Sequence, residues 1–171
     1  VGTRFWGVDP AKDFPRIKSF IDAATLIGPT FVAVNNDKDK IDTIHIFPDV
    51  AFPVTPWGKF VMPLNAIIQA AALAKADYLL LASSEFPPTK EQVDCLLQHM
   101  DTETLVVGAA MAEHEFQPLG HTYPEASGTT VPWNTFALWN LTHLQKLGIP
   151  LQGDGLFNPE MAGVEEICTI V

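Results

Sequence analysis

The chain has 171 residues, of which 47% are hydrophobic and 18% charged, and its formal net charge is −10. This composition is typical of a globular domain with a hydrophobic core and excludes a disordered chain. The negative charge argues against nucleic-acid partners, because a polyanion would be repelled. The sequence has no apolar run of about 18 residues, so we expect no membrane span, and the lack of a signal peptide favours a cytoplasmic location.

Apolar periodicity and turn residues predict strands and helices that alternate along the chain. Short apolar runs predict strands at 3–8, 30–36, 41–47, 78–83 and 104–111. Helical spacing predicts helices at 14–28, 59–76, 90–100 and 133–148. The prolines between residues 48 and 58 predict a loop, and the polar residues 112–131 predict another.

Capping residues support three of the predicted helix ends. Asp13 is expected to begin the first helix. Thr89 and Gln92 have the spacing of a capping box at the start of the third. Gly148 is expected to end the last helix.

This alternation predicts an α/β fold with three layers, in which a mostly parallel sheet carries helices on both faces. We expect residues 1–171 to form one domain. In such sheets ligands bind beyond the carboxyl ends of the strands, so polar residues at those positions are candidates for a site.

Several common catalytic motifs are missing. The sequence has no G-x-x-x-x-G-K-[ST] loop, no G-x-G-x-x-G and no G-x-S-x-G elbow, which argues against a nucleotide triphosphatase, a standard dinucleotide dehydrogenase and a serine hydrolase. The neighbouring acids Glu165 and Glu166 allow two interpretations. One of them could act as a general base at a cleft, or both could be solvated acids that complement the dipole at the start of a helix.

Five segments in one order carry a family resemblance: "VNND", "GKFVMPLNAIIQAAALAKADYLLLASSEFPP", "VVGAAM", "PWNTFALWNLTHLQKLGIP" and "GVEE". This order resembles family 2-type glycosyltransferases of the GT-A fold. The resemblance implies a Rossmann-like domain whose residues 1–111 form the nucleotide-sugar-binding half and whose residues 112–171 form the acceptor-side half. The family usually continues past the acidic pair, so we expect an acceptor-binding part to be missing from the carboxyl end.

The resemblance also implies roles for individual residues. The partners would be a nucleoside-diphosphate sugar and a carbohydrate or glycoconjugate acceptor. Trp133 and Asn134 would face the acceptor. Glu166, or else Glu165, would be the base that deprotonates the acceptor hydroxyl in an inverting displacement. The implied donor-binding residues are Val8, Asp9, Asn36, Asp37, Lys59, Asn65, Ser83, Ser84 and Glu85.

The chain departs from the family at its metal-binding motif. Ser83-Ser84-Glu85 stands where the family has Asp-x-Asp, whose carboxylates hold a divalent ion. Three outcomes follow. Glu85 could bind Mn²⁺ or Mg²⁺ weakly. The enzyme could work without metal, with Lys59 or backbone N–H groups neutralising the diphosphate. Or the domain could be a noncatalytic GT-A-like one that binds a nucleotide, a sugar or a protein.

Overall fold

The computed structural model of the protein describes residues 1–35, 41–112, 114, 126–155 and 164–170. The strands are β1 (Gly2–Phe5), β2 (Phe31–Val34), β3 (Ala51–Pro53), β4 (Tyr78–Ala82), β5 (Val106–Gly108) and β6 (Phe136–Asn140). The helices are α1 (Pro10–Thr25), α2 (Thr43–Ile46), α3 (Val61–Leu73), α4 (Lys90–Leu97), α5 (Leu141–Leu147), the 3-10 helix η1 (Leu151–Asp154) and α6 (Glu165–Ile170). In these ranges no helix is both long and apolar enough to cross a membrane.

The six strands form one sheet in the order β3-β2-β1-β4-β6-β5. Strands β1 to β4 pair in parallel. Strand β6 lies between β4 and β5 and is antiparallel to both. The α/β prediction is confirmed, but the sheet is mixed and not mostly parallel. The error arises at β6, because its residues were assigned to a helix and its reversed direction was therefore missed.

The predicted helix over 133–148 is wrong in its first half, which forms β6. All five residues of β6 are buried. A strand that is covered on both faces shows no apolar alternation, so its pattern cannot be distinguished from that of a buried helix. The second half forms α5, which Asn140 caps by accepting the N–H of Thr142 at 3.0 Å. Gly148 ends this helix as predicted, with φ at +64°.

The third strand also differs from its prediction. Residues 43–46 form the short helix α2 instead of a strand, so His45 lies on a helix, where it is exposed. The strand is β3, within the segment 48–58 that was predicted to be a loop. Strand β3 is at the edge of the sheet, so Pro53 can be tolerated there without breaking an inner ladder.

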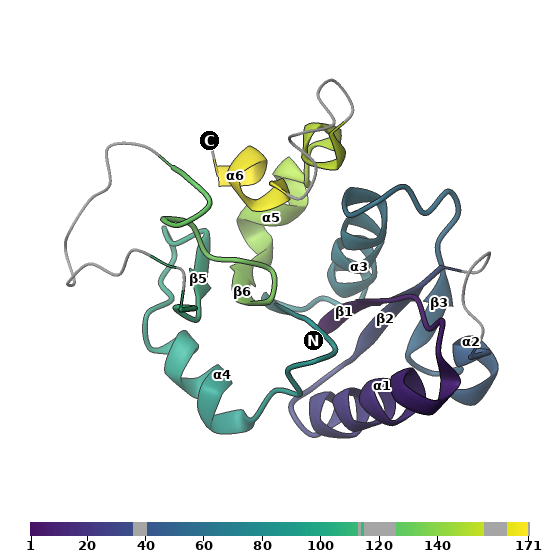
Figure 1. Ribbon diagram of the computed structural model, residues 1–171. Coiled ribbons are helices and arrows are strands. Elements are labelled where there is room, and N and C mark those ends of the chain that lie inside the picture. The colour runs from purple at the N-terminus through teal and green to yellow at the C-terminus, as the bar shows by residue number, and fades with distance from the viewer. Residues whose placement is uncertain (36–40, 113, 115–125, 156–163, 171) are drawn as a thin grey trace.

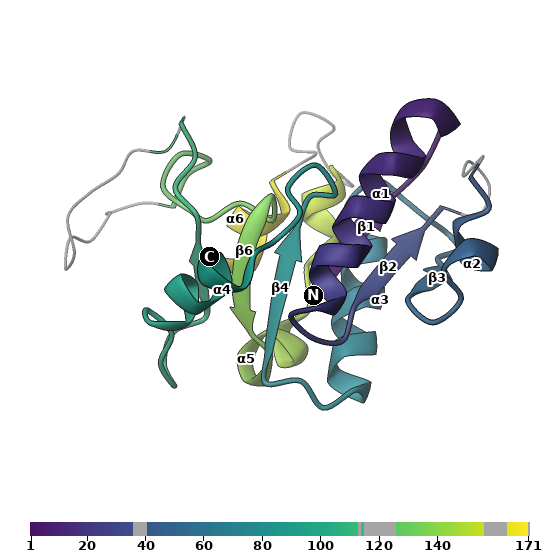
Figure 2. The ribbon, with the colours of Figure 1, turned by 90° about the horizontal axis from the view of Figure 1, so that it is seen from below.

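Helices cover both faces of the sheet, giving three layers (Figure 1). Helices α3 and α5 pack with buried residues of the strands on one face, among them the fully buried Trp139. Helices α1 and α4 pack on the opposite face through Phe20, Val93 and Leu96. Figure 2 shows this second face from below, with α1 in front of the sheet and running alongside β2.

The predicted start of α4 is confirmed, whereas α1 begins at a different residue from the one predicted. The capping box of Thr89 and Gln92 is present at the start of α4 and confirms that prediction. Helix α1 begins earlier than predicted, and its N-cap is Asp9, which accepts the N–H of Ala11 at 3.1 Å. Asp13 is buried inside the first turn and accepts the N–H groups of Val8 and Asp9, each at 2.9 Å. Asp13 therefore holds the loop that follows β1.

The ends of three strands lie side by side along one edge of the sheet, the edge formed by the carboxyl ends of β1 and β4. Strands β1 and β4 end there, and the antiparallel β6 begins there. The N–H of Ser83, just after β4, donates to the carbonyl of Thr135, just before β6, at 2.9 Å. Helix α6 lies close to this edge, because Glu165 contacts Arg4 of β1. Residues from both halves of the chain therefore meet at this edge.

Candidate active site

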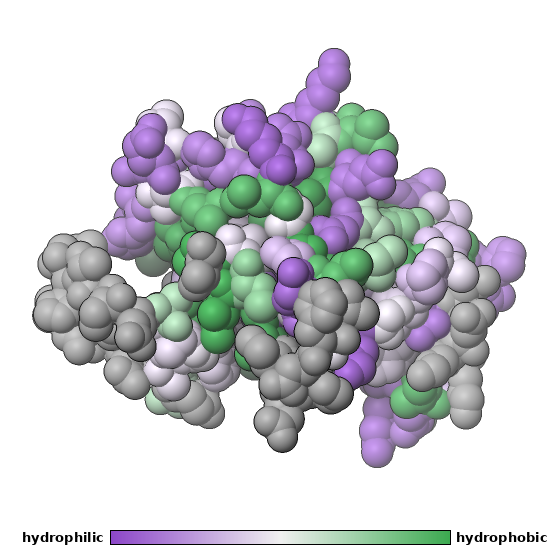
Figure 3. Space-filling model, turned by 90° about the horizontal axis from the view of Figure 1, so that it is seen from above, coloured by the Kyte–Doolittle hydropathy of each residue, from purple (hydrophilic) through white to green (hydrophobic). Residues whose placement is uncertain are grey.

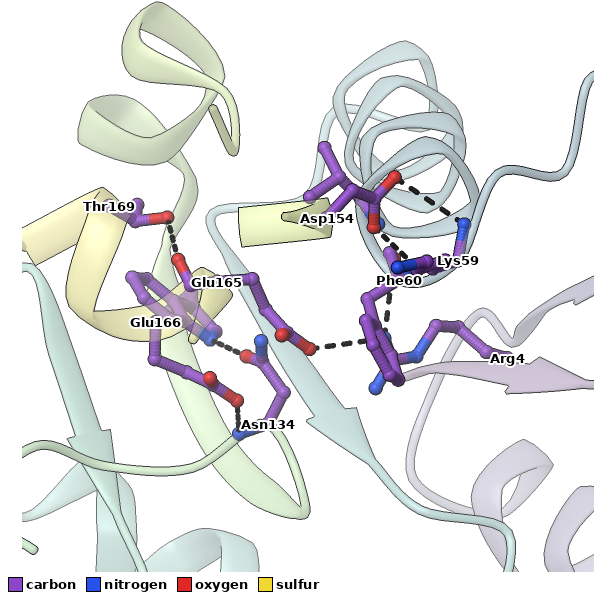
Figure 4. A network of polar contacts seen from close by, with 10 residues as sticks. Arg4, Lys59, Phe60, Asn134, Asp154, Glu165, Glu166 and Thr169 are labelled. Carbon is purple, nitrogen blue, oxygen red and sulfur yellow. Dashed lines mark hydrogen bonds and ion pairs between the residues drawn. The ribbon is translucent and has the colours of Figure 1, made fainter. Parts of the chain in front are cut away.

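Glu165 and Glu166 open helix α6, and both are buried, with 3% and 8% of their surfaces exposed. Neighbouring residues of a helix point in different directions. Glu165 points toward Arg4, with 3.1 Å between its Oε1 and Nη1. Glu166 points toward Asn134, whose backbone N–H donates to Oε1 at 2.6 Å. Figure 4 shows the two side chains diverging from the helix. Of the two interpretations from the sequence, a solvated helix start is therefore wrong.

Arg4 is the cation of this site, and the sequence analysis missed it. Alternate residues of β1 face opposite sides of the sheet, so Phe5 packs with α1 while Arg4 faces α6. Its Nη1 also donates to the carbonyl of Phe60 at 3.2 Å, and its guanidinium lies 5.3 Å from the centre of the Phe60 ring. The available signal was an arginine inside a short apolar strand, because a buried arginine needs a charged partner.

The environment of Glu166 raises its pKa from the usual 4.5 to about 7. Burial has the largest effect, because it disfavours the charged form. The neighbouring charge of Glu165 acts in the same direction, while the hydrogen bond from Asn134 and the positive charge of Arg4 act against it. A carboxyl group with this pKa exists in both protonation states at neutral pH, which is what proton transfer requires.

Glu166 lines a cavity of about 360 Å³, which we call the α6 cavity. Its size falls in the range of about 300–1,000 Å³ that is usual for ligand sites. Figure 3 looks down on the side of α3, α5 and α6, where apolar side chains are exposed in the middle of the face. The residues lining the cavity are Arg4, Phe60, Gly128, Val131, Trp133, Thr135, Val164, Glu165, Glu166 and Ile167.

A smaller cavity of about 130 Å³, which we call the β1–β4 cavity, adjoins the α6 cavity. Arg4 and Thr135 line both cavities. Ser83, at the end of β4, lines only the smaller one, together with Trp6 and Asn134. Trp6 is half exposed and packs edge-on against Trp57, with 6.1 Å between the ring centres.

Asp154 supports the site from η1. Its carboxylate accepts the backbone N–H groups of Phe60 and Val61 at 2.5 and 2.9 Å, at the start of α3 (Figure 4). This cap holds Phe60 in place, and Phe60 in turn contacts Arg4. The hydroxyl of Thr169 donates to the carbonyl of Glu165 at 2.6 Å. The "GDG" turn at 153–155 therefore helps to position the residues of the site. Its sequence alone did not indicate this role.

The predicted acceptor residues both reach the site. Trp133 lines the α6 cavity, its Nε1 donates to the carbonyl of Gly128 at 2.5 Å, and its ring lies 4.5 Å from that of His114. Asn134 is buried, and its Oδ1 accepts the indole N–H of the core residue Trp139 at 2.9 Å. The structure therefore brings Trp133, Asn134, Glu165, Glu166 and Ser83 together.

Other predicted donor-binding residues lie elsewhere or have structural contacts. Val8 and Asp9 form the loop that begins α1. Lys59 is exposed at the start of α3 and does not line either cavity. The amide of Asn65 exchanges two hydrogen bonds, of 2.9 and 2.8 Å, with the backbone of Ile149. Asn36 and Asp37 lie outside the described residues.

Glu85, the predicted metal ligand, is separated from the acid pair. Its side chain is 62% exposed and pairs with Arg16 of α1 at 3.3 Å. It lines a third, mainly apolar cavity of about 630 Å³ between α4 and β5, and does not line the α6 cavity. Ser84, beside it, is buried.

The described residues do not fit a divalent-metal centre at this strand end. Mn²⁺ and Mg²⁺ require several oxygen ligands, usually including carboxylates. Ser83 offers one neutral oxygen, and Glu85 is held by Arg16. Over the described ranges, no group of three or more His, Cys, Asp or Glu side chains is placed to hold a metal ion.

No family model matches the chain, and comparisons with curated proteins and with solved structures find no significant match.

Proposed function

We propose that this chain is a glycosyltransferase domain that transfers a sugar from a nucleoside-diphosphate donor to an acceptor hydroxyl, with Glu166 as the general base. The observation that carries the proposal is the buried carboxyl group of Glu166, whose pKa is raised to about 7 and which lines the α6 cavity. A base with this pKa can accept a proton near neutral pH. The sequence resemblance implied the same role for Glu166, or else for Glu165.

The proposed reaction is a single displacement with inversion. The acceptor oxygen forms a bond to the anomeric carbon while the bond from that carbon to the diphosphate oxygen breaks. The hydroxyl proton passes to Glu166, and the nucleoside diphosphate leaves with the bonding electron pair. The N–H of Asn134 holds Oε1 of Glu166 at 2.6 Å, which orients the carboxylate.

The position of the cavities supports this chemistry. Both lie where β1 and β4 end, and ligands of open α/β sheets bind at such ends. The parallel strands β1–β4 followed by a reversed strand beside β4 are consistent with a GT-A arrangement. Trp133 lines the α6 cavity, and an aromatic side chain can pack against the apolar face of a sugar.

A second candidate is a noncatalytic domain of the same architecture that binds a nucleotide, a sugar or a protein. Glu85 favours it, because this acid pairs with Arg16 and lines a different cavity from Glu166. The two candidates agree on a ligand at the strand ends and differ on whether a sugar is transferred.

The test compares Glu166→Gln with Glu103→Gln, an exposed acid outside both cavities. Each protein is incubated with uridine- and guanosine-diphosphate sugars and candidate acceptors, and released nucleoside diphosphate is measured. We expect wild type and Glu103→Gln to release it. Glu166→Gln should lose at least about a hundredfold of the rate, which is a typical contribution of a general base. Nucleotide affinity should persist in this variant, because the substitution removes only the base.

Two results would contradict the proposal. Equal rates in Glu166→Gln and Glu103→Gln would remove Glu166 as the base. Nucleotide binding by the wild type without any release of nucleoside diphosphate from the sugar nucleotides would favour the noncatalytic candidate.

A further inference from the structure

The β1–β4 cavity is rich in hydrogen-bond donors. Of its lining residues, Arg4 carries a guanidinium, Ser83 and Thr135 carry hydroxyl groups, and Asn134 carries an amide. None of the residues that line it is acidic. The carboxylates of Glu165 and Glu166 lie in the neighbouring α6 cavity, on the other side of Arg4. A cation and hydroxyl groups, with no carboxylate beside them, can bind an oxyanion through charge-assisted hydrogen bonds.

Asn134 supports this assignment independently. Its surface is only 5% exposed, and its Oδ1 is used by the indole N–H of Trp139. Its Nδ2 is buried and has no acceptor within the described part of the chain. An unpaired buried donor costs free energy, so a native structure usually provides a partner for it. Asn134 lines the β1–β4 cavity, so an oxygen of a bound anion is one candidate partner, and Oε2 of Glu165, likewise buried and unpaired, is another.

Arg4 has donors left for a ligand. Both hydrogen bonds that it makes with described residues use Nη1, which contacts Glu165 and Phe60. The guanidinium has five N–H donors in a fixed fork, and this geometry matches phosphate oxygens. Its side chain is 19% exposed, so a ligand in the cavity can reach it.

We propose that the β1–β4 cavity is a phosphate site in which Arg4, Ser83 and Asn134 bind the oxyanion without a divalent cation. At about 130 Å³ the cavity is smaller than a usual ligand pocket, so it takes a phosphate group and not a whole ligand. Ser83 occupies the strand end where the resembling family holds its metal, and here Arg4 supplies the positive charge. Identifying the phosphate as part of a sugar donor's diphosphate rests on the proposed function.

This arrangement separates phosphate binding from proton transfer, because the two functions lie in different cavities that share Arg4. The phosphate lies in the β1–β4 cavity, and the base Glu166 lies in the α6 cavity. The anion shares the guanidinium with Glu165, which already holds Nη1. Removing the charge of Glu165 should therefore strengthen anion binding, and removing Arg4 as well should abolish it.

The experiment measures pyrophosphate binding by calorimetry in the presence of EDTA. Removing Arg4 alone leaves the buried Glu165 unpaired and risks unfolding, so the decisive pair is Glu165→Gln and the double variant Arg4→Gln/Glu165→Gln. We expect Glu165→Gln to bind pyrophosphate more tightly than wild type. The double variant should bind at least about tenfold more weakly than Glu165→Gln, as expected for the loss of charged hydrogen bonds. Arg16→Gln, the matched arginine outside both cavities, should bind like wild type.

Equal affinities of Glu165→Gln and the double variant would overturn the inference, and so would binding that requires added Mn²⁺. Assays of sugar transfer on the same proteins separate this inference from the proposed function. Pyrophosphate binding that depends on Arg4, in a protein that transfers no sugar, would keep the phosphate site and reject the enzyme. Sugar transfer that needs Mn²⁺, without binding of pyrophosphate in EDTA, would reject the phosphate site and keep the enzyme.

Discussion

Arg4 and Glu165 form an ion pair of 3.1 Å across 161 positions of the sequence. The pair joins the first strand of the sheet to the last described helix. Only 19% of the Arg4 side chain and 4% of the Glu165 side chain are exposed, so solvent screens the pair weakly. Because Glu165 adjoins Glu166, this contact also sets the position of the proposed base.

Replacement of Arg4 by glutamine should destabilise the fold strongly. The variant leaves the buried carboxylate of Glu165 without a cation, and breaking a buried pair in this way costs about 3 kcal/mol. The double variant Arg4→Gln/Glu165→Gln should regain most of this loss, since it leaves no unpaired charge. Urea denaturation measures both free energies of unfolding. Lys18→Gln, which removes only an exposed pair with Asp22, is the control, and a loss as large as that of Arg4→Gln would show that the buried pair has no special weight.

The contribution of Glu166 to the stability of the protein should fall as the pH rises from about 5 toward 8. The folded-state pKa of Glu166, about 7, lies above its usual value of 4.5, so between these values the folded state binds more protons than the unfolded state. This contribution therefore decreases with pH over this window, by about 3–4 kcal/mol at most if each pKa unit contributes about 1.4 kcal/mol. Denaturation of wild type and Glu166→Gln at pH 5 and pH 8 measures the effect. Between pH 5 and pH 8 the wild type should lose stability relative to the variant, and parallel curves would contradict the raised pKa.

Asp154→Ala should destabilise helix α3. The carboxylate of Asp154 accepts the N–H groups of Phe60 and Val61, which have no partners inside the helix. Loss of such a cap costs about 1–2 kcal/mol, and Asp154→Asn should lose less because it keeps an acceptor oxygen. Chemical denaturation of both variants, with the exposed Asp49→Ala as control, provides the measurement. Equal stability of Asp154→Ala and Asp49→Ala would show that this contact does not support the helix.

Gly153→Ala should disturb the acid pair by displacing the backbone of Glu165. A Cβ at Gly153 would lie 2.7 Å from the Cα of Glu165, so the backbone of α6 has to shift. We expect a loss of about 1–3 kcal/mol in the free energy of unfolding, as for other overpacked sites. Gly28→Ala is the matched control, because a Cβ there meets no atom within 4 Å. Thermal unfolding of the two variants compares them, and equal melting temperatures would mean that α6 tolerates the shift.

The sequence by itself determined the α/β class, the elements with clear local signals and several site candidates. The capping box at Thr89 and the glycine stop at Gly148 depend on residues within one turn of the helix end, so both were predictable. The acid pair Glu165–Glu166 was recognised as a candidate because the two glutamates are adjacent in the sequence.

Only the tertiary structure decided which of these groups meet. Strand β6 is buried on both faces, so its direction and its type depend on the neighbours β4 and β5 and not on its own pattern. Arg4 lies in the site because β1 lies beside β4. Glu85 lies outside the site and pairs with Arg16 of α1. The pKa of Glu166 likewise depends on burial and on charges brought from distant parts of the chain. Electrostatic and packing energies depend on distance in space, and spacing along the chain does not specify that distance.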